Sequence, residues 1–372
     1  MKSSSPGLLY RLKKLNRKRN RYFHELKRRA RLVYLARPLP TAQKSERFPE
    51  GMRKILFPFV NLGIGDAVCH TGLWRKLKEV GYSVQIISES RSEVFFRGLD
   101  FIDEIFIVDI DNIDRLERIK TDIVVSLYSW MQRKELLETE LLSRIDYSYA
   151  INIGGWLKKP YHMTLDLPDN FHITVPQKLL LTKLGHPVSD LHYRLKPPAA
   201  SNEFIAKYLH KSGERKRVVI SPFASVGERS MTLPQLEELI AKLRQQDGVN
   251  LFITGEKHKL ASLVSDTDNV FICDFDSLWH TIALVNNADL VISVETAIVH
   301  VACALNKKLV SIFYSTNINY NDALQSNTIF KPIGKDVKQI IVNRTTLPFE
   351  TDKVIQESLA MLSSADVGEP CM

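Results

Sequence analysis

The sequence predicts an α/β protein of two domains, each built on a parallel sheet with helices on both faces. Two observations carry this prediction. From residue 53 onward, short apolar runs alternate with segments of helical length, a pattern typical of parallel sheets. The chain also has 372 residues, of which 44% are hydrophobic and 25% charged. This length and composition suit two soluble domains of ordinary size.

Four segments are predicted along the chain. Residues 1–50 form a basic helical extension with a linker, 51–195 and 196–350 form the two α/β domains, and 351–372 form a C-terminal helix and tail. The passage between the domains is placed in residues 191–216, where two consecutive prolines precede a polar helix and a Gly-Glu-Arg-Lys turn.

The N-terminal extension carries the positive charge of the protein. Residues 1–44 contain 14 Lys and Arg against the single acid Glu25, while the rest of the chain has slightly more acidic than basic residues. Residues 8–36 lack glycine and proline and are predicted to form one or two helices. A basic helix with leucine and aromatic side chains suits an anionic bilayer surface. Nucleic-acid binding and packing on the body or on a second subunit are the alternatives.

Other classes of protein fit the sequence poorly. No apolar run approaches the roughly 18–20 residues of a membrane span, and no apolar segment of signal-peptide type follows the basic N-terminus. Cys69, Cys273, Cys303 and Cys371 are scattered, without zinc spacing. Three of them fall in apolar elements, which indicates reduced, buried thiols in a cytoplasmic protein.

The first domain is predicted to begin with a strand, a glycine-rich turn and a helix. Strands are expected at residues 54–60, 83–89, 104–110 and 123–128, and helices at 67–81, where Gly81 ends the helix, and at 175–184. A short helical segment precedes the fourth strand. The rest of 130–190 is expected to be less regular.

The second domain repeats this alternation. Strands are expected at residues 218–223, 250–255, 269–275, 291–293 and 307–314, and helices at 233–246 and 277–288, with a last helix at 352–363.

Residues 291–305 provide the first candidate site. A buried strand is predicted to stop at Glu295-Thr296 and to turn directly into an apolar helix that carries His300. The first N–H groups of such a helix have no partner within it, and they therefore offer an anion site in the adjacent crevice. Thr296 can cap this helix, and His300 lies on the same face four residues later. The alternative is an ordinary turn with a capping threonine and a core histidine.

The turn Gly63-Ile64-Gly65-Asp66 is the second candidate. Its glycines allow a ligand or another backbone to approach closely. A carboxylate at a helix N-terminus is stabilised as the anion, so Asp66 would be available as a base. Asp66 as a simple N-cap is the alternative.

The third candidate is the loop from Ser221 to Ser230, which follows a predicted strand. Ser221, Ser225 and Arg229 suit phosphate oxygens at the carboxyl end of a parallel sheet; a solvated loop is the alternative. Asp109 and Asp111 could hold a divalent metal, but Asx residues are expected at the turn that begins there. The sequence has no Walker A motif and no GxSxG motif.

Taken together, these motifs resemble a known family. GIGDAVCHTGLWRKLKEVG is similar to the GDxxxxTPxLRxLK segment of the ADP-heptose lipopolysaccharide heptosyltransferases (glycosyltransferase family 9). SPFAS…TLPQLEELI resembles their PGAS…KxWPxxxxxxL segment, and LFITGE resembles their VxxGG strand. ADLVISVETAIVHVACAL resembles ADLVVGxDTGPMHLAAAL, the most specific segment. The resemblance covers residues 53–320 in the correct order.

The resemblance implies a GT-B glycosyltransferase, in which two Rossmann-like domains face each other across a cleft. The N-terminal domain would bind the acceptor, with Gly63 and Gly65 on that side, and the C-terminal domain would bind the nucleotide-sugar. Asp66 matches the proposed catalytic base. The donor-binding positions, which match the family, lie in the third loop or follow the strand that ends at Gly255, are Ser221, Ser225, Arg229, Glu256, Glu295, Thr296, Ala297 and His300.

Several of these positions depart from the family pattern. Glu295 replaces an aspartate that contacts sugar hydroxyls, and Ala297 replaces a glycine of the phosphate turn. The family lysine aligns with Met231 and the family tryptophan with Leu233, so Arg229 is the candidate to supply the missing charge. Glu256 is assigned as a ribose contact from its position alone.

The activity implied by the resemblance is inverting, metal-independent transfer of heptose from ADP-heptose to the inner core of lipopolysaccharide or lipooligosaccharide. No cofactor and no nucleic-acid partner are expected. The acceptor would be of the lipid A–Kdo type, and residues 1–44 would hold this cytoplasmic protein at the inner face of the inner membrane. The alternatives are a related transferase with another donor or a protein acceptor, and a non-catalytic sugar-nucleotide-binding protein.

Overall fold

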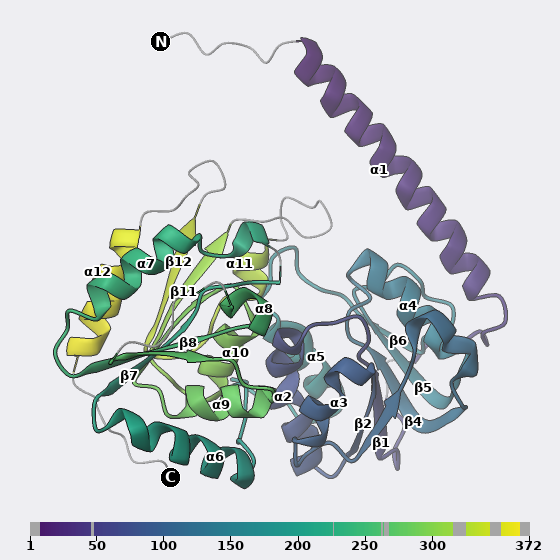
Figure 1. Cartoon of the computed structure of the whole chain (residues 1–372). Helices are drawn as coiled ribbons and strands as arrows, with labels where there is room; N and C mark the ends of the chain where they lie inside the picture. Colours follow the sequence, from purple (N-terminus) through teal and green to yellow (C-terminus); the bar gives the residue numbers. More distant parts are fainter. Residues whose placement is uncertain are drawn as a thin grey trace.

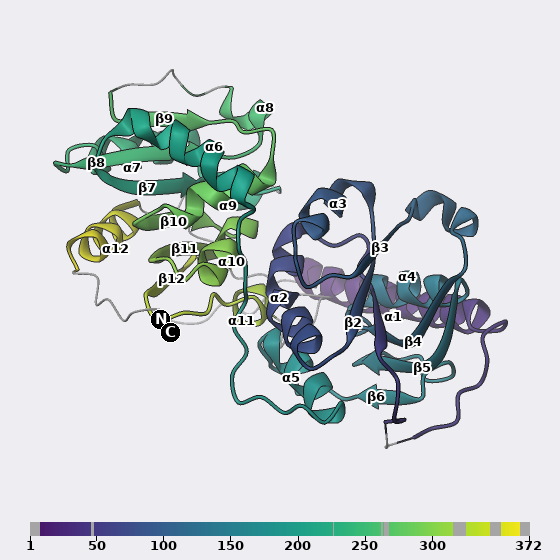
Figure 2. The ribbon, with the colours of Figure 1, turned by 90° about the horizontal axis from the view of Figure 1, so that it is seen from below.

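Two six-stranded parallel sheets form the framework of the protein (Figures 1 and 2). The computed structural model describes residues 8–45, 48–225, 227–261, 263, 268–314, 325–342 and 351–364. The first sheet is built from the first half of the chain and the second sheet from the second half. The expected α/β fold with two Rossmann-like domains is confirmed.

The first sheet has the strand order β3-β2-β1-β4-β5-β6, and all of its pairs are parallel. Its strands are β1 (Lys54–Pro58), β2 (Ser83–Ser88), β3 (Glu104–Ile107), β4 (Ile119–Ser126), β5 (Ile145–Ile153) and β6 (Met163–Leu165). Between them lie the helices α2 (Ile64–Glu79), α3 (Ser90–Arg97) and α4 (Gln132–Leu142), with a 3-10 turn η1 (Ile110–Arg115). The helix α5 (Thr174–Lys183) follows β6.

The second sheet has the order β12-β11-β10-β7-β8-β9, again entirely parallel. Its strands are β7 (Lys216–Ser221), β8 (Val249–Thr254), β9 (Val270–Cys273), β10 (Leu290–Val294), β11 (Leu309–Tyr314) and β12 (Val337–Val342). Its helices are α6 (Ala199–Leu209), α7 (Leu233–Leu243), α8 (Lys257–Leu260), α9 (Leu278–Asn286), α10 (Ala297–Ala304), α11 (Ser326–Ile329) and α12 (Thr351–Ser363), with short 3-10 turns at His210–Ser212 and Gly227–Arg229.

Alternate residues of each strand pack on opposite faces of the sheet, because successive side chains of a strand point in opposite directions. In β1, Ile55 and Phe57 belong to the core beneath α2, whereas Leu56 packs with α4 and α1 on the other face. In β7, Val219 belongs to the same core as Ile55 and Phe57, whereas its neighbours Val218 and Ile220 pack in a separate core on the other face of the second sheet. Both faces of each sheet are therefore apolar, as parallel sheets require.

The helices between the two sheets form one continuous hydrophobic core. Trp74 and Leu77 of α2 belong to the same buried cluster as Ala283 of α9 and Val301 of α10. The two domains are thus joined by a shared apolar layer, and a wide separation would expose it to water at a cost of about 25 cal/mol per Å².

Trp279 anchors this layer. It belongs to α9 of the second domain, and its indole N–H donates a 3.0 Å hydrogen bond to the carbonyl oxygen of Val94 in α3. Its ring stacks on Phe95, with centroids 5.6 Å apart. Gly98 ends α3 directly against the indole, and a Cβ at this position would lie 2.3 Å from the ring. Only glycine leaves room for the ring here.

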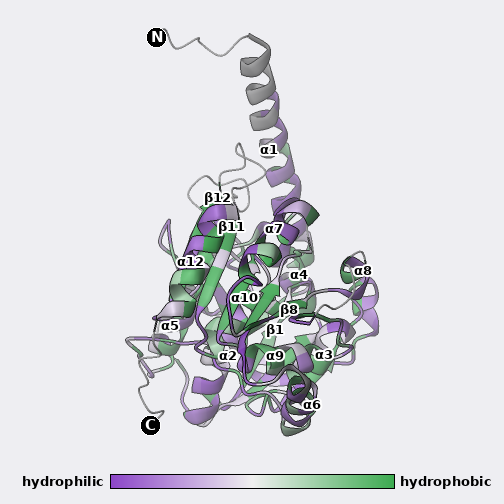
Figure 3. Ribbon diagram, turned by 60° about the vertical axis from the view of Figure 1, so that its left-hand side comes forward, coloured by the Kyte–Doolittle hydropathy of each residue, from purple (hydrophilic) through white to green (hydrophobic). Residues whose placement is uncertain are grey.

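The N-terminal extension forms one 28-residue helix, α1 (Leu8–Leu35). The prediction allowed one or two helices in this region. Figure 1 shows α1 running along the first domain and projecting beyond it. Figure 3 shows apolar strands inside the molecule and polar residues on the outward parts of the helices. No helix in the described ranges combines the length and apolar character needed to cross a membrane.

Several element predictions need correction. The second predicted helix starts at Ile64 rather than at residue 67, so Gly65 and Asp66 lie in its first turn. The strand expected at 104–110 ends at Ile107, because Asp109 starts the 3-10 turn η1. Residues 130–190, expected to be less regular apart from the helix at 175–184, also contain α4, β5 and β6. The positive φ of Gly81, +93°, accounts for the predicted end of α2.

Candidate active site

The turn between β10 and α10 is built as predicted. Thr296 caps α10 by accepting a 3.2 Å hydrogen bond from the N–H of Ile298, and its hydroxyl lies 3.1 Å from that of Ser293. Ser293 is buried in β10, directly opposite Ser221 of β7 in the sheet register. This places the first N–H groups of α10 at the carboxyl edge of the sheet, where they have no partner within the helix. Such an edge is the usual ligand position in open α/β sheets.

Glu295 and Arg229 form an ion pair beside this turn. Arg229 Nη1 lies 3.1 Å from Glu295 Oε1, and the carboxylate is almost completely buried. Burial raises the pKa of Glu295, while the Arg229 guanidinium and the Ser326 hydroxyl oppose the shift. The pair brings two predicted donor-binding residues together and holds a guanidinium next to the start of α10.

Asp66 lies in the first turn of α2, where it accepts a 2.8 Å hydrogen bond from the N–H of Gly63. The alternative of Asp66 as the N-cap is wrong, because Gly63 is the N-cap of α2 and Asp66 is the third residue of the helix, where it accepts back from the N-cap N–H. Tyr128 donates from its hydroxyl to Asp66 Oδ1 at 3.5 Å, and the ring of His70 lies 2.8 Å from the Asp66 carbonyl oxygen through Nδ1. One carboxylate oxygen thus caps the helix, and the other faces Tyr128.

The environment of Asp66 changes its acidity. Burial raises the pKa of the Asp66 carboxyl, whereas the Gly63 N–H, Lys134, Tyr128 and Arg229 lower it by smaller amounts. A raised pKa makes a carboxylate a stronger base, which general-base chemistry near neutral pH requires. The predicted anion-stabilising effect of the helix terminus is thus outweighed by desolvation.

Helices α2 and α10 meet across the domain interface at Gly65. A Cβ placed on Gly65 would lie 3.3 Å from the Ala297 Cα and 3.3 Å from His300 Cδ2. Gly65 and Asp66 belong to the first turn of α2, and Ala297 begins α10. The first turns of the two helices, which are separated by more than 200 residues of chain, therefore lie side by side. The structure brings the two strongest candidate sites to one place.

His300 is held inside this interface. Its ring is 5% exposed, makes edge-to-face contacts with Tyr193 and Phe330, and has no hydrogen-bond partner for Nδ1 among the described residues. Burial lowers the pKa of His300 to about 3, so the ring is neutral at neutral pH. Its observed position is that of a packed interdomain residue.

The remaining predicted residues lie around the loop after β7. Ser221 is buried, Ser225 is exposed, and Glu256 caps α8 with its side chain in an ion pair with Lys259, 2.9 Å away. The Lys259 ammonium also donates to the carbonyl oxygen of Ala224, which ties α8 to the loop.

Met231, which aligns with the family lysine, is buried in the core of the second domain. Its side chain is surrounded by apolar groups and carries no charge. The guanidinium of Arg229, the predicted replacement, lies 3.1 Å from the carboxylate of Glu295.

Two residues near Asp66 were not predicted. Tyr128 follows β4, and Lys134 in the first turn of α4 lowers the pKa of Asp66 through its charge. Lys134 itself is half-buried, and burial lowers the pKa of its ammonium. The sequence signal for Tyr128 was its position at the end of a predicted strand. Lys134 lies in the region that was expected to be irregular.

Metal binding by the Asp109 pair is not supported by its geometry. Asp109 accepts a 3.0 Å hydrogen bond from the N–H of Asp111 and so forms the Asx turn given as the alternative. Within the described ranges, no three His, Cys, Asp or Glu side chains are grouped so as to hold a metal ion. Cys69, Cys273 and Cys303 are free and buried, as predicted; Cys371 lies outside the described residues.

A cavity of about 640 Å³ also lies between the domains, lined by His172, His192 and Lys331 among others. None of the predicted site residues is among those that line it. We assign the candidate site to the α2–α10 contact, because that contact gathers the carboxylate, the guanidinium and the helix N-terminus.

Replacing Gly65 with leucine is expected to weaken both stability and activity. The added side chain would push α10 away from α2, and such overpacking typically costs about 1–3 kcal/mol. Thermal unfolding of the variant measures this loss. Gly255→Ala is the matched control, because a Cβ there makes ordinary contacts of 3.6 Å or more with Leu260 and Phe223. Equal melting temperatures for Gly65→Leu and the native protein would contradict the close contact.

Comparison with known proteins finds similarity to one family. Residues 158–351, a little more than half of the chain, match the family described as Glycosyltransferase family 9 (heptosyltransferase). A protein of Escherichia coli (strain K12), provisionally named lipopolysaccharide heptosyltransferase 4, is 21% identical over 330 residues. That alignment covers 86% of this chain and 89% of the relative.

Solved structures show the same fold. The ADP-heptose lipopolysaccharide heptosyltransferase II of E. coli superimposes with a TM-score of 0.63 at 14% identity, covering 84% of this chain and 98% of its own. The family 9 glycosyltransferase of Veillonella parvula DSM 2008 gives 0.67 at 13% identity, covering 86% and 99%. E. coli heptosyltransferase WaaC, solved with ADP-2-deoxy-2-fluoro heptose, gives 0.62 at 15% identity, covering 82% and 98%.

Proposed function

Because the chain belongs to glycosyltransferase family 9 (heptosyltransferase), we propose that it moves a heptose from ADP-heptose to the inner core of lipopolysaccharide or lipooligosaccharide. The names of the relatives support this choice of donor and product class. The observation that carries the proposal is the contact of Gly65 with Ala297 and His300, because it brings the first turn of α2, which carries Asp66, next to the start of α10 across the domain interface.

Asp66 is the proposed general base. In the proposed step the acceptor hydroxyl oxygen attacks the anomeric carbon of the heptose while the bond to the diphosphate oxygen breaks. The hydroxyl proton passes to the Asp66 carboxylate, and ADP leaves with the electron pair. A single displacement of this kind inverts the anomeric centre. Tyr128 orients the carboxylate, and burial strengthens it as a base.

The leaving diphosphate is proposed to bind at the start of α10. The N–H groups near Thr296 and Ala297 and the guanidinium of Arg229 would stabilise the charge that develops on it. Such N–H groups and a guanidinium can supply this stabilisation without a metal ion, so we propose a metal-independent reaction with no cofactor. Glu295, held by Arg229, would contact sugar hydroxyls.

The remaining donor contacts are proposed in the loop after β7. Ser221 and Ser225 would serve phosphate or ribose oxygens, and Glu256 would contact the ribose. His300 is proposed to support the donor site from inside the domain interface, where it packs against Gly65.

We further propose that the acceptor is of the lipid A–Kdo type. An acceptor of this kind is embedded in a bilayer, so the enzyme would act as a peripheral protein at the cytoplasmic, inner face of the inner membrane. The excess of basic residues in residues 1–44 supports this location, because it would attract anionic lipid head groups.

The donor can be identified by thermal unfolding in the presence of candidate nucleotide-sugars. ADP-heptose at about 100 times its dissociation constant should stabilise the protein by about 2.7 kcal/mol, whereas GDP-sugars and UDP-sugars at equal concentration should not. Stabilisation by UDP-sugars alone would contradict the proposed donor. Donor binding without transfer to any acceptor would favour a non-catalytic sugar-nucleotide-binding protein.

Replacing Arg229 with methionine is expected to raise the dissociation constant of ADP about 10- to 100-fold. Hydrogen bonds to charged groups contribute about 1.5–3 kcal/mol, and methionine removes the charge while keeping much of the side-chain volume. Isothermal titration with ADP measures the change. Arg229→Lys is the control that keeps the charge but loses the planar fork, so it should have an intermediate effect. Unchanged ADP affinity in Arg229→Met would exclude Arg229 from the diphosphate site.

A further inference from the structure

Helix α1 has one face that is fixed to the first domain. Glu25, Arg28, Leu32 and Ala36 follow one another at helical spacing, and all four face the domain. Leu32 and Ala36 belong to the hydrophobic cluster that also contains Leu141 of α4. The helix is therefore packed against the body along its second half.

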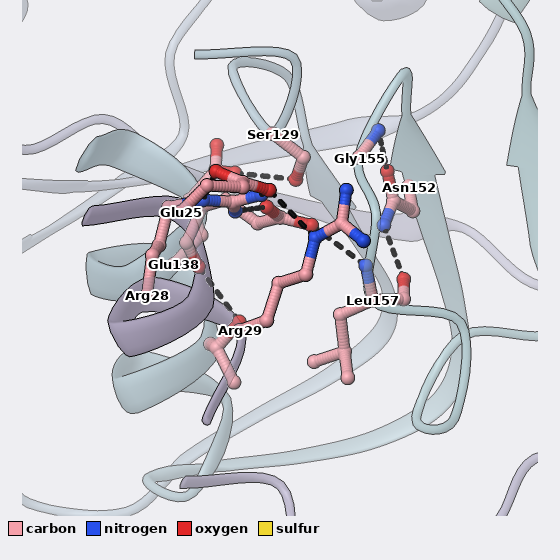
Figure 4. Close-up of polar contacts among 10 residues, drawn as sticks. Glu25, Arg28, Arg29, Ser129, Glu138, Asn152, Gly155 and Leu157 are labelled. Atoms are coloured by element: carbon pink, nitrogen blue, oxygen red, sulfur yellow. Dashed lines mark hydrogen bonds and ion pairs between the residues drawn. The ribbon is translucent and has the colours of Figure 1, made fainter. Parts of the chain in front are cut away.

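A buried ion pair is the centre of this contact, which we call the α1–α4 clamp and define by Arg28 and Glu135. Arg28 Nη1 pairs with Glu135 Oε2, and the other carboxylate oxygen accepts a 2.7 Å hydrogen bond from the N–H of Leu157. Glu25 also holds Arg28, through two hydrogen bonds of 2.8 and 2.6 Å. Figure 4 shows the Arg28 side chain reaching from α1 into this polar cluster. Lys159 adds a 2.8 Å bond to the carbonyl oxygen of Ala36.

The opposite face of α1 is apolar and exposed. Its large side chains are 45–66% exposed and lie at helical spacing on the outer side: Tyr22, Phe23, Leu26, Val33 and Tyr34. Trp156, from the segment between β5 and β6, is 40% exposed and lies beside α1, with the Arg29 guanidinium 5.1 Å from its ring centroid. Isolated exposed apolar residues are ordinary, but a contiguous set along one face indicates an interaction surface.

Basic side chains surround this apolar face. Arg19, Lys27, Arg31 and Arg37 are exposed along the helix and just after it. The only acid of residues 1–44, Glu25, points to the inner side, where it pairs with Arg28 and Arg29. The outer face thus combines aromatic and aliphatic groups with positive charge, and this combination fits the interface of an anionic bilayer.

Two other partners fit this face less well. A symmetric dimer through α1 would place the same cationic face against itself, because a twofold interface pairs identical surfaces. A nucleic acid would satisfy the basic residues, but it offers no apolar environment for Leu26 and Val33.

We propose that α1 is a rigid interfacial anchor, in which Tyr22, Phe23, Leu26, Val33, Tyr34 and Trp156 insert into an anionic lipid surface while the α1–α4 clamp fixes that surface relative to the active-site wall. The inference rests on the proposed function only in expecting a membrane-borne acceptor. It assigns the contact to a particular face and adds Trp156, which lies outside the basic extension.

The clamp gives this anchor a connection to Asp66. The helix α4 that carries Glu135 also carries Glu138, whose carboxylate accepts 2.9 and 2.6 Å hydrogen bonds from the N–H of Tyr128 and the hydroxyl of Ser129. Tyr128 in turn reaches Asp66. Helix α4 thus contacts α1 through Glu135 and the turn that carries Tyr128 through Glu138, so the bilayer plane would have a fixed orientation relative to the active site.

The test is flotation of the full chain with lipid vesicles, using phosphatidylcholine alone and phosphatidylcholine with about one quarter phosphatidylglycerol as a bacterial-type anionic surface. The variants are Phe23→Ser with Leu26→Ser, Trp156→Ser, and Lys27→Glu. Val94→Ser is the matched control, because Val94 is an exposed aliphatic residue on another helix of the same domain, 62% exposed.

The native protein and Val94→Ser should bind the anionic vesicles equally. The Phe23 and Leu26 double variant should bind at least about tenfold more weakly, and the loss should persist at high salt, because it removes inserted apolar surface. Trp156→Ser should weaken binding severalfold. Lys27→Glu should weaken it mainly at low salt, because surface charges are screened by ions. Transfer to a soluble, delipidated acceptor should be unchanged in all of these variants.

Three results would overturn the proposal. The first is undiminished vesicle binding by the Phe23 and Leu26 double variant. The second is a dimer of the native protein that this variant converts to a monomer, since the face would then be a subunit contact. The third is duplex DNA binding that exceeds vesicle binding at the same salt. Absence of transfer from any donor by the native protein would instead remove the proposed function and leave the vesicle result intact.

Discussion

Replacing Asp66 with asparagine is expected to lower kcat about 100- to 10,000-fold, the usual contribution of a general base. Asparagine has nearly the same shape, and its carbonyl oxygen can still accept the hydrogen bond from Gly63 that caps α2. The affinity for ADP should therefore change little, because the proposed diphosphate contacts lie on α10. Steady-state transfer rates together with ADP titration separate the two effects.

The pH profile provides an independent check on Asp66. Burial raises the pKa of this carboxyl, so the base becomes protonated at a higher pH than an ordinary aspartate, whose pKa is about 3.9. Activity should accordingly fall as the pH drops through that raised value and should recover above it. Asp66→Asn should lose this acidic limb in its residual activity. Full turnover by the variant, or an unaltered acidic limb, would assign the base to another residue.

Replacing Arg28 with alanine is expected to destabilise the first domain by about 3–5 kcal/mol, the typical effect of removing one partner of a buried ion pair. Glu135 would remain buried with only the N–H of Leu157 as its partner. The helix α1 would also lose its main polar attachment. Denaturant unfolding measures the loss of stability, and limited proteolysis of residues 37–45 reports the release of α1.

Two variants test the specificity of this effect. Arg31→Ala removes an exposed pair with Glu140, 3.9 Å apart, and should cost less than about 1 kcal/mol. Adding Glu135→Gln to Arg28→Ala removes the unpaired charge and should recover part of the stability. A loss below about 1 kcal/mol in Arg28→Ala alone would show that the clamp does not hold α1 in place.

Two contacts at the candidate site depend on neighbouring residues alone. The Thr296 cap follows from local chemistry, because a hydroxyl at the end of a strand can accept from the N–H two residues later. The Asp66 capping bond is equally local, since donor and acceptor are three residues apart. The spacing of apolar residues and the positions of the glycines likewise predict most strands and helices of both domains.

The errors arise where local pattern was weak or misleading. The strand β5 begins with Ile145-Asp146-Tyr147-Ser148, in which two half-buried residues and the exposed Ser148 precede the continuous buried run. The helix α4 carries Glu135 and Glu138 on its buried side, so its inner face does not appear apolar in the sequence. Both glutamates are buried because partners from α1, the turn after β4 and the loop after β5 satisfy them, and none of these partners belongs to α4 itself.

The sequence by itself determined the two parallel sheets, the basic first helix and the polar turns at the strand ends, because these depend on neighbouring residues. Only the tertiary structure decided that Gly65 meets Ala297, that Arg229 pairs with Glu295, and that Met231 is buried. The raised pKa of Asp66 was decided in the same way, since it arises from desolvation by packed neighbours. Some of these features join segments more than 200 residues apart in the sequence. Their contribution to the free energy of folding arises only when packing removes the water between the segments.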